Sequence, residues 1–121
     1  MAELGPFLIP NHSDTPVLNP NSWNKNAHLL FIDQPVGVGF SNGMKREWPR
    51  VAADYAKDAL EFFVKFYAVY PQFAGKDLYI FGESYGGHYI PAIAKALVDS
   101  GNPDILLKGI GIGNGFYKGG V

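Results

Sequence analysis

Hydrophobic and polar positions follow two different periods along the chain. Over residues 51–70 charged side chains recur three or four positions apart, with apolar and aromatic residues between them: Asp54, Lys57, Asp58, Glu61 and Lys65. This spacing predicts an amphipathic helix that buries its aromatic face in a core. Pro71 predicts the end of this helix, because the residue before a proline disfavours the helical conformation.

Three shorter apolar runs, at residues 27–32, 78–81 and 106–112, predict buried strands. A second helix is expected after residues 78–81. Because proline breaks a helix interior, we expect this helix to be interrupted before Pro91 and to start again there. Strands and helices then alternate, with crossovers long enough for parallel pairing. The pattern therefore predicts the α/β class with a mostly parallel sheet, preceded by irregular loops or a short extended edge over residues 5–26.

Composition narrows the class of protein further. A chain of 121 residues forms at most one domain, and 47% hydrophobic residues predict a packed core. A formal charge of −1 offers no electrostatic case for binding nucleic acid or an anionic membrane. There is no apolar run long enough to span a bilayer, and there is no cysteine. The first residues lack the basic and apolar regions of a signal peptide, so we expect none in them. We expect neither a cofactor nor a metal.

The main chemical signal lies at residues 82–86, which fit the pattern G-x-S-x-G between a predicted strand and a predicted helix. That context predicts a nucleophile elbow, in which a strained turn lifts the Ser84 hydroxyl above the sheet edge. The backbone N–H of Tyr85 can then face a developing oxyanion. We expect a Cβ atom at Gly82 or Gly86 to collide with the strand or the helix. The alternative is a glycine-rich turn with an incidental serine.

Several segments in a fixed order carry a family resemblance. Residues 31–41, 82–91 and 109–115 resemble the serine carboxypeptidase family of carboxypeptidase Y-like enzymes, and residues 3–6 and 19–24 are similar to it too. The resemblance implies an α/β-hydrolase fold and the release of C-terminal residues from peptides and proteins. It also implies a vacuolar, lysosomal or secreted location.

The resemblance assigns roles to four residues. Ser84 matches the family's nucleophile, and Tyr85 matches the residue whose backbone N–H forms half of the oxyanion hole. Glu83 and Glu3 match glutamates that help to bind the terminal carboxylate of the substrate. Two neighbouring carboxyl groups do not both ionise readily, so one keeps its proton and can donate a hydrogen bond to a third carboxylate. Such a site prefers acidic pH.

The sequence also departs from the family. In α/β-hydrolases an acid and then a histidine follow the nucleophile. Here His88 is the only histidine after Ser84, and the acids Asp99 and Asp104 come after it with no histidine behind them. We interpret His88 as a structural hydrogen-bonding residue. The segment that supplies the second oxyanion donor is not in the sequence.

These departures predict a single partial hydrolase domain over residues 1–121, incomplete at both ends, with the remainder of the enzyme missing. Two alternatives stay open: an inactive relative that acts at most as a binding module, and a related acyltransferase.

Overall fold

A computed structural model describes residues 4–117 of the chain. The chain divides into two compact units, with the boundary between Asp33 and Gln34. The predicted site residues at 83–85 lie in the second unit.

The first unit is built on a short antiparallel pair of strands, β1 (Phe7–Leu8) and β2 (Val17–Leu18), followed by the 3-10 helix η1 (Trp23–Lys25). The buried side chain of Asn19 donates a 2.9 Å hydrogen bond to the carbonyl of Gly5. An amide that is hydrogen-bonded in this way can be buried without a large desolvation cost, so Asn19 joins the two strand segments.

The predicted strand at residues 27–32 is wrong, because this segment is irregular in the structure. A strand exists only through hydrogen bonds to a partner strand. In the part of the chain that the structure describes, β1 pairs only with β2 and β3 pairs only with β4. Leu30 and Phe31 remain partly exposed in the first unit, so apolar character alone was not enough to form a strand here.

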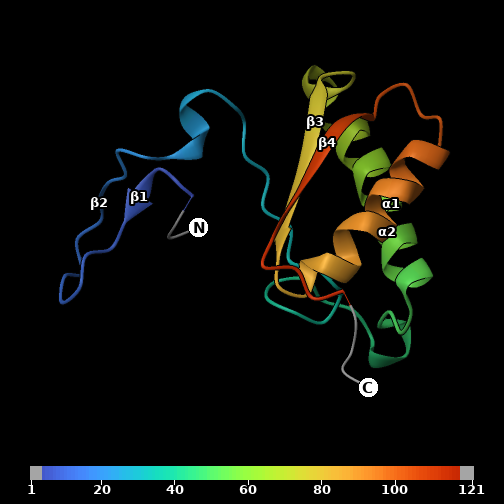
Figure 1. Cartoon of the computed structure of the whole chain (residues 1–121), viewed down its shortest axis with the longest axis horizontal. Helices are drawn as coiled ribbons and strands as arrows, with labels where there is room; N and C mark the ends of the chain where they lie inside the picture. Colours follow the sequence, from blue (N-terminus) through green and yellow to red (C-terminus); the bar gives the residue numbers. More distant parts are fainter. Residues whose placement is uncertain (1–3, 118–121) are drawn as a thin grey trace. The chain divides into compact units, whose positions relative to one another are not determined.

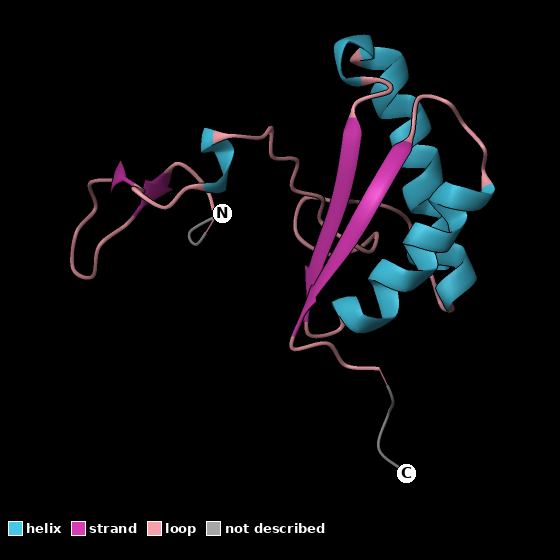
Figure 2. Ribbon diagram, turned by 45° about the horizontal axis from the view of Figure 1, so that its top comes forward, coloured by secondary structure: helices cyan, strands magenta, loops and turns pink. Residues whose placement is uncertain are grey.

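The second unit contains a parallel pair of strands, β3 (Asp77–Glu83) and β4 (Leu106–Gly113). The predicted strands at 78–81 and 106–112 and their parallel pairing are confirmed. The register places Glu83 opposite Gly113 at the carboxyl end of both strands. The helices α1 (Ala52–Val69) and α2 (Gly86–Asp99) lie side by side on one face of this sheet (Figures 1 and 2).

Helix α1 confirms the prediction for residues 51–70. Its first turn is capped by the Asp54 carboxylate, which accepts hydrogen bonds from the backbone N–H groups of Arg50 and Val51 at 3.0 and 3.3 Å. These bonds satisfy donors that have no partner inside a helix, and the negative charge suits the positive helix N-terminus. The helix ends at Val69, and its C-cap residue Tyr70 precedes the 3-10 helix η3 (Pro71–Phe73).

The prediction that the second helix restarts at Pro91 is wrong, since α2 runs through Pro91 without a break. Proline removes one helical hydrogen bond, which its N–H would have donated to the carbonyl of Gly87. Ile90 and Ile93 are buried on the same helix. Burying such side chains contributes about 1.5–3 kcal/mol each, which offsets the lost bond.

The core of the second unit lies between α1, α2 and the sheet. Its buried residues come from all of these elements and from the turn before β4: Ala59, Phe63, Tyr67, Ile80, Ile90, Ile93, Leu97 and Ile105. The aromatic residues of α1 serve this packing. None of the described helices is long and apolar enough to cross a membrane.

We predict that Leu97→Ala lowers the free energy of unfolding by about 3 kcal/mol, because Leu97 is only 2% exposed and its loss leaves a cavity. The matched control is Val98→Ala, since the neighbouring Val98 is 65% exposed and its replacement changes stability by less than about 0.5 kcal/mol. Urea unfolding followed by circular dichroism measures both values. Equal losses would contradict the assigned core.

Candidate active site

Ser84 lies directly after β3, and α2 starts two residues later. Its φ angle is 53°, in the left-handed region that non-glycine residues rarely adopt. This conformation costs about 1–2 kcal/mol, so the surrounding structure must hold it. The prediction of a strained backbone at Ser84 is confirmed. The serine also sits at the carboxyl end of a parallel strand, where α/β sheets place their ligands.

Hydrogen bonds on both sides fix the Ser84 backbone. Its N–H donates to the carbonyl of Gly113 at 3.0 Å, which continues the pairing of β3 and β4 by one residue. Its carbonyl accepts from the N–H of Phe116 at 2.7 Å and from the N–H of Gly87 at 3.0 Å. The end of β4, the residues after it and the first turn of α2 therefore hold the Ser84 backbone in its left-handed conformation.

The two glycines of the G-x-S-x-G pattern differ in their surroundings. A Cβ atom on Gly82 would lie 2.7 Å from Cγ1 of Ile90 and 3.2 Å from Cα of Gly86, so the expected collision is confirmed there. A Cβ atom on Gly86 would meet only Cγ1 of Ile90 at 3.8 Å, which is an ordinary contact. The expected collision at Gly86 is therefore wrong.

The backbone N–H of Tyr85 has no hydrogen-bond acceptor among residues 4–117. It follows Ser84 directly and stands at the N-terminus of α2, where the helix dipole adds partial positive charge. A free donor in this position suits a negatively charged oxygen.

The Tyr85 side chain belongs to a cluster of aromatic rings next to Ser84. Its ring centroid lies 4.7 Å from that of His88, 5.0 Å from Tyr89 and 6.1 Å from Phe116. Tyr89 in turn meets Tyr55 of α1 edge-on at 4.7 Å. This packing restricts the residue whose N–H is the candidate donor.

Burial raises the pKa of the Tyr55 and Tyr89 phenols above their ordinary value, and the nearby Tyr85 raises them further. Both phenols therefore stay protonated near neutral pH. They act as packing groups and are not available as bases.

His88 packs against Tyr85 and lies edge-on to Phe116 at 5.5 Å. Within the described part of the chain it makes no side-chain hydrogen bond, and none to Ser84. The interpretation of His88 as a structural residue fits these ring contacts, whereas the hydrogen bond expected of it is not found. A general base must reach the hydroxyl proton.

Of the two glutamates expected to bind a carboxylate, Glu83 is the exposed last residue of β3, immediately before Ser84. Glu3 lies outside the described residues, so the expected approach of the two carboxyl groups stays a prediction. Within residues 4–117, no group of three or more His, Asp or Glu side chains is placed to hold a metal ion.

Sequence reasoning missed the contribution of Gly87, Phe116, Tyr55 and Tyr89 to this site. The adjacent glycines at 86 and 87 were a signal of close approach by another backbone. The identity of that backbone could not be read from the sequence, because Phe116 lies far along the chain.

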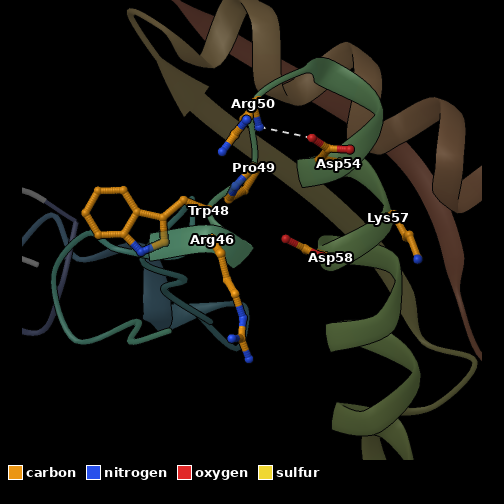
Figure 3. Close-up of a pocket in the computed structure, with 7 residues that line it drawn as sticks. All are labelled: Arg46, Trp48, Pro49, Arg50, Asp54, Lys57 and Asp58. Atoms are coloured by element: carbon orange, nitrogen blue, oxygen red, sulfur yellow. Dashed lines mark hydrogen bonds between the residues drawn. The ribbon is translucent and has the colours of Figure 1, made fainter. Parts of the chain in front are cut away.

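A separate pocket of about 280 Å³ lies at the N-terminal end of α1 (Figure 3). It is lined by charged residues of both signs and one indole: Arg46, Trp48, Pro49, Arg50, Asp54, Lys57 and Asp58. In Figure 3 the Asp58 side chain extends from α1 on the side where Arg46 lies. The pocket includes none of the predicted site residues.

Comparisons with known proteins agree with this geometry. The family model for serine carboxypeptidases matches residues 1–119. Serine carboxypeptidase-like 26 of Arabidopsis thaliana is 43% identical over 114 residues, which are 93% of this chain and 25% of that protein. Carboxypeptidase Y homolog A of Talaromyces marneffei is 43% identical over 117 residues, covering 97% of this chain and 20% of that protein.

A solved structure matches as well. Kex1Δp, a prohormone-processing carboxypeptidase from Saccharomyces cerevisiae, superposes with a TM-score of 0.83 at 31% sequence identity. The match covers 96% of this chain and 27% of Kex1Δp. The chain thus spans between a fifth and about a quarter of the length of these three relatives.

A parallel strand, a strained serine and a following helix, together with this structural match, place the chain in the α/β-hydrolase class. Within that class the chain belongs to the serine carboxypeptidase family. The resemblance and the fold class predicted from the sequence are confirmed.

We predict that Ser84→Gly is about 1 kcal/mol more stable than Ser84→Ala, because only glycine adopts a φ of 53° without steric cost. Urea unfolding of the two variants measures the difference. The control is Ala92→Gly inside α2, which lowers stability by about 1 kcal/mol because glycine is a poor helix former. If glycine destabilises position 84 as it does position 92, the serine is not strained.

Proposed function

We propose that Ser84 is the nucleophile of a serine-type carboxypeptidase that releases C-terminal residues from peptides and proteins. The observation that carries this proposal is the Ser84 backbone, held at φ 53° at the end of β3 beside the unpartnered N–H of Tyr85. Family membership of a segment matched over residues 1–119 supports it.

The reaction follows from these groups. The Oγ atom of Ser84 attacks the last peptide carbonyl, and its proton passes to a general base. The carbonyl oxygen becomes negatively charged and accepts a hydrogen bond from the Tyr85 N–H. The C–N bond then breaks, the leaving amine takes up the proton, and water hydrolyses the acyl-enzyme. His88 does not contact Ser84 within the described residues, so the proposal assigns the base and the second oxyanion donor to other groups of the enzyme.

The preference for a free C-terminus is assigned to carboxyl groups. Glu83 places an exposed carboxyl one residue from the nucleophile, and the proposal pairs it with Glu3. Where two carboxyl groups lie close, one retains its proton and donates a hydrogen bond to the substrate carboxylate. A role in an acidic vacuolar, lysosomal or secreted setting fits this chemistry.

The test exchanges this 121-residue segment for the matching 27% of Kex1Δp. We expect the chimera to hydrolyse a peptide that Kex1Δp itself cleaves, with a free C-terminus preferred over the C-terminal amide. Ser84→Ala should lower kcat on the order of a millionfold, because a triad without its nucleophile retains little catalysis. Mass spectrometry of the released amino acid follows the reaction.

The matched control is Ser100→Ala, an exposed serine beyond the end of α2, which should keep the activity of the chimera. The 121-residue chain alone should not turn over the peptide, because a serine hydroxyl without a base is a poor nucleophile. A folded chimera that is equally active with Ser84→Ala would refute the proposed function. Transfer of the acyl group to an added alcohol in place of water would identify an acyltransferase.

A further inference from the structure

The segment after β4 approaches α2 so closely at Gly87 that a side chain at this position would not fit. A Cβ atom on Gly87 would lie 2.5 Å from the carbonyl oxygen of Phe116, 2.7 Å from its nitrogen and 2.9 Å from its carbonyl carbon. All three are backbone atoms, so the contact cannot be relieved by a change of rotamer. Only glycine fits at position 87.

The same Phe116 backbone holds the strained serine. Its N–H donates the 2.7 Å hydrogen bond to the carbonyl of Ser84, and Asn114, with φ 46°, turns the chain toward that bond. A side chain at position 87 would push Phe116 away and break the bond. Ser84 would then lose one of the contacts that keep it in the left-handed region.

The preceding glycine provides a contrast. Neither Gly86 nor Gly87 has a positive φ, so neither needs to be glycine for conformational reasons. They differ only in the room available for a side chain, because a Cβ atom on Gly86 meets nothing closer than 3.8 Å. The glycine that completes the G-x-S-x-G pattern therefore tolerates alanine, whereas the next glycine does not.

We propose that Gly87 and the Phe116 backbone form a positioning contact for the nucleophile. Gly87 gives Phe116 room to bind the Ser84 carbonyl, and this bond keeps the Ser84 hydroxyl aimed at the substrate. The inference rests on the proposed role of Ser84 and goes beyond it, because it assigns a function to two residues outside the pattern. The proposal assigns neither residue a contact with the substrate.

The first arm of the test uses Gly86→Ala and Gly87→Ala in the Kex1Δp chimera. For Gly87→Ala we expect kcat to fall about a hundredfold, the usual effect of a misplaced reacting group, while KM stays within about threefold. Gly86→Ala should change kcat by less than about threefold. Activity is expressed per folded molecule, so a loss of folding alone does not lower it. Equal kcat values for the two folded variants would overturn the proposal.

A second pair of variants covers the case in which Gly87→Ala fails to fold. Phe116→Pro removes the N–H that binds Ser84, whereas Phe116→Ala keeps the N–H and removes only the ring. We expect a fall in kcat of about a hundredfold for the proline variant and of less than about tenfold for the alanine variant. The opposite order would show that the ring matters instead of the backbone, and would overturn the proposal.

A final arm does not depend on catalysis. Amide hydrogen exchange of the 121-residue chain, or of the chimera, should show a protected Phe116 N–H in the parent and in Gly86→Ala. Protection should fall at least about tenfold in Gly87→Ala. If protection is the same in both variants, the positioning contact is refuted even where Ser84 is the nucleophile. If Ser84→Ala keeps full activity, the proposed function fails and the exchange result still stands.

Discussion

The candidate site depends on the strained backbone of Ser84 and on the hydrogen bonds that hold it. A left-handed serine persists only where neighbouring groups make every relaxed conformation worse. Here Gly113 receives the Ser84 N–H, and Phe116 donates to the Ser84 carbonyl. Gly113 is the last residue of β4 and Phe116 follows three residues later, so the parallel pairing of β3 and β4 and the geometry of the candidate nucleophile are linked.

The packing below this peptide makes the arrangement rigid. Ile80 of β3 and Ile90 of α2 belong to the same buried cluster, and the Cγ1 atom of Ile90 occupies the space that a side chain on Gly82 would need. Strand, turn and helix therefore fit together only without a Cβ atom at that point. The aromatic residues of α1, of which Tyr55 reaches Tyr89, extend this packing to the candidate oxyanion donor.

Much of the second unit could be predicted from the sequence. The local pattern of apolar and polar residues was enough to predict the strands 78–81 and 106–112 and the helix at 51–70. The strand at 27–32 could not be judged in the same way, since its existence depends on a partner strand. Pro91 was misjudged because core packing outweighed the loss of one hydrogen bond.

The candidate site, too, could be predicted only in part from the sequence. The pattern at residues 82–86 gave the position and strain of Ser84, but placed the second steric limit at Gly86. The structure places that limit at Gly87, against Phe116. A contact between residues so far apart in the chain leaves no local trace in the sequence beyond the glycine itself.

We propose that the strained Ser84 carries the reactive hydroxyl, with the Tyr85 N–H facing the oxyanion. A crystal structure of the Kex1Δp chimera after reaction with diisopropyl fluorophosphate tests it most directly. We expect phosphorus bonded to Ser84 Oγ, a positive φ at Ser84, and a phosphoryl oxygen about 3 Å from the Tyr85 nitrogen. An adduct on another residue, or a phosphoryl oxygen turned away from Tyr85, would contradict it.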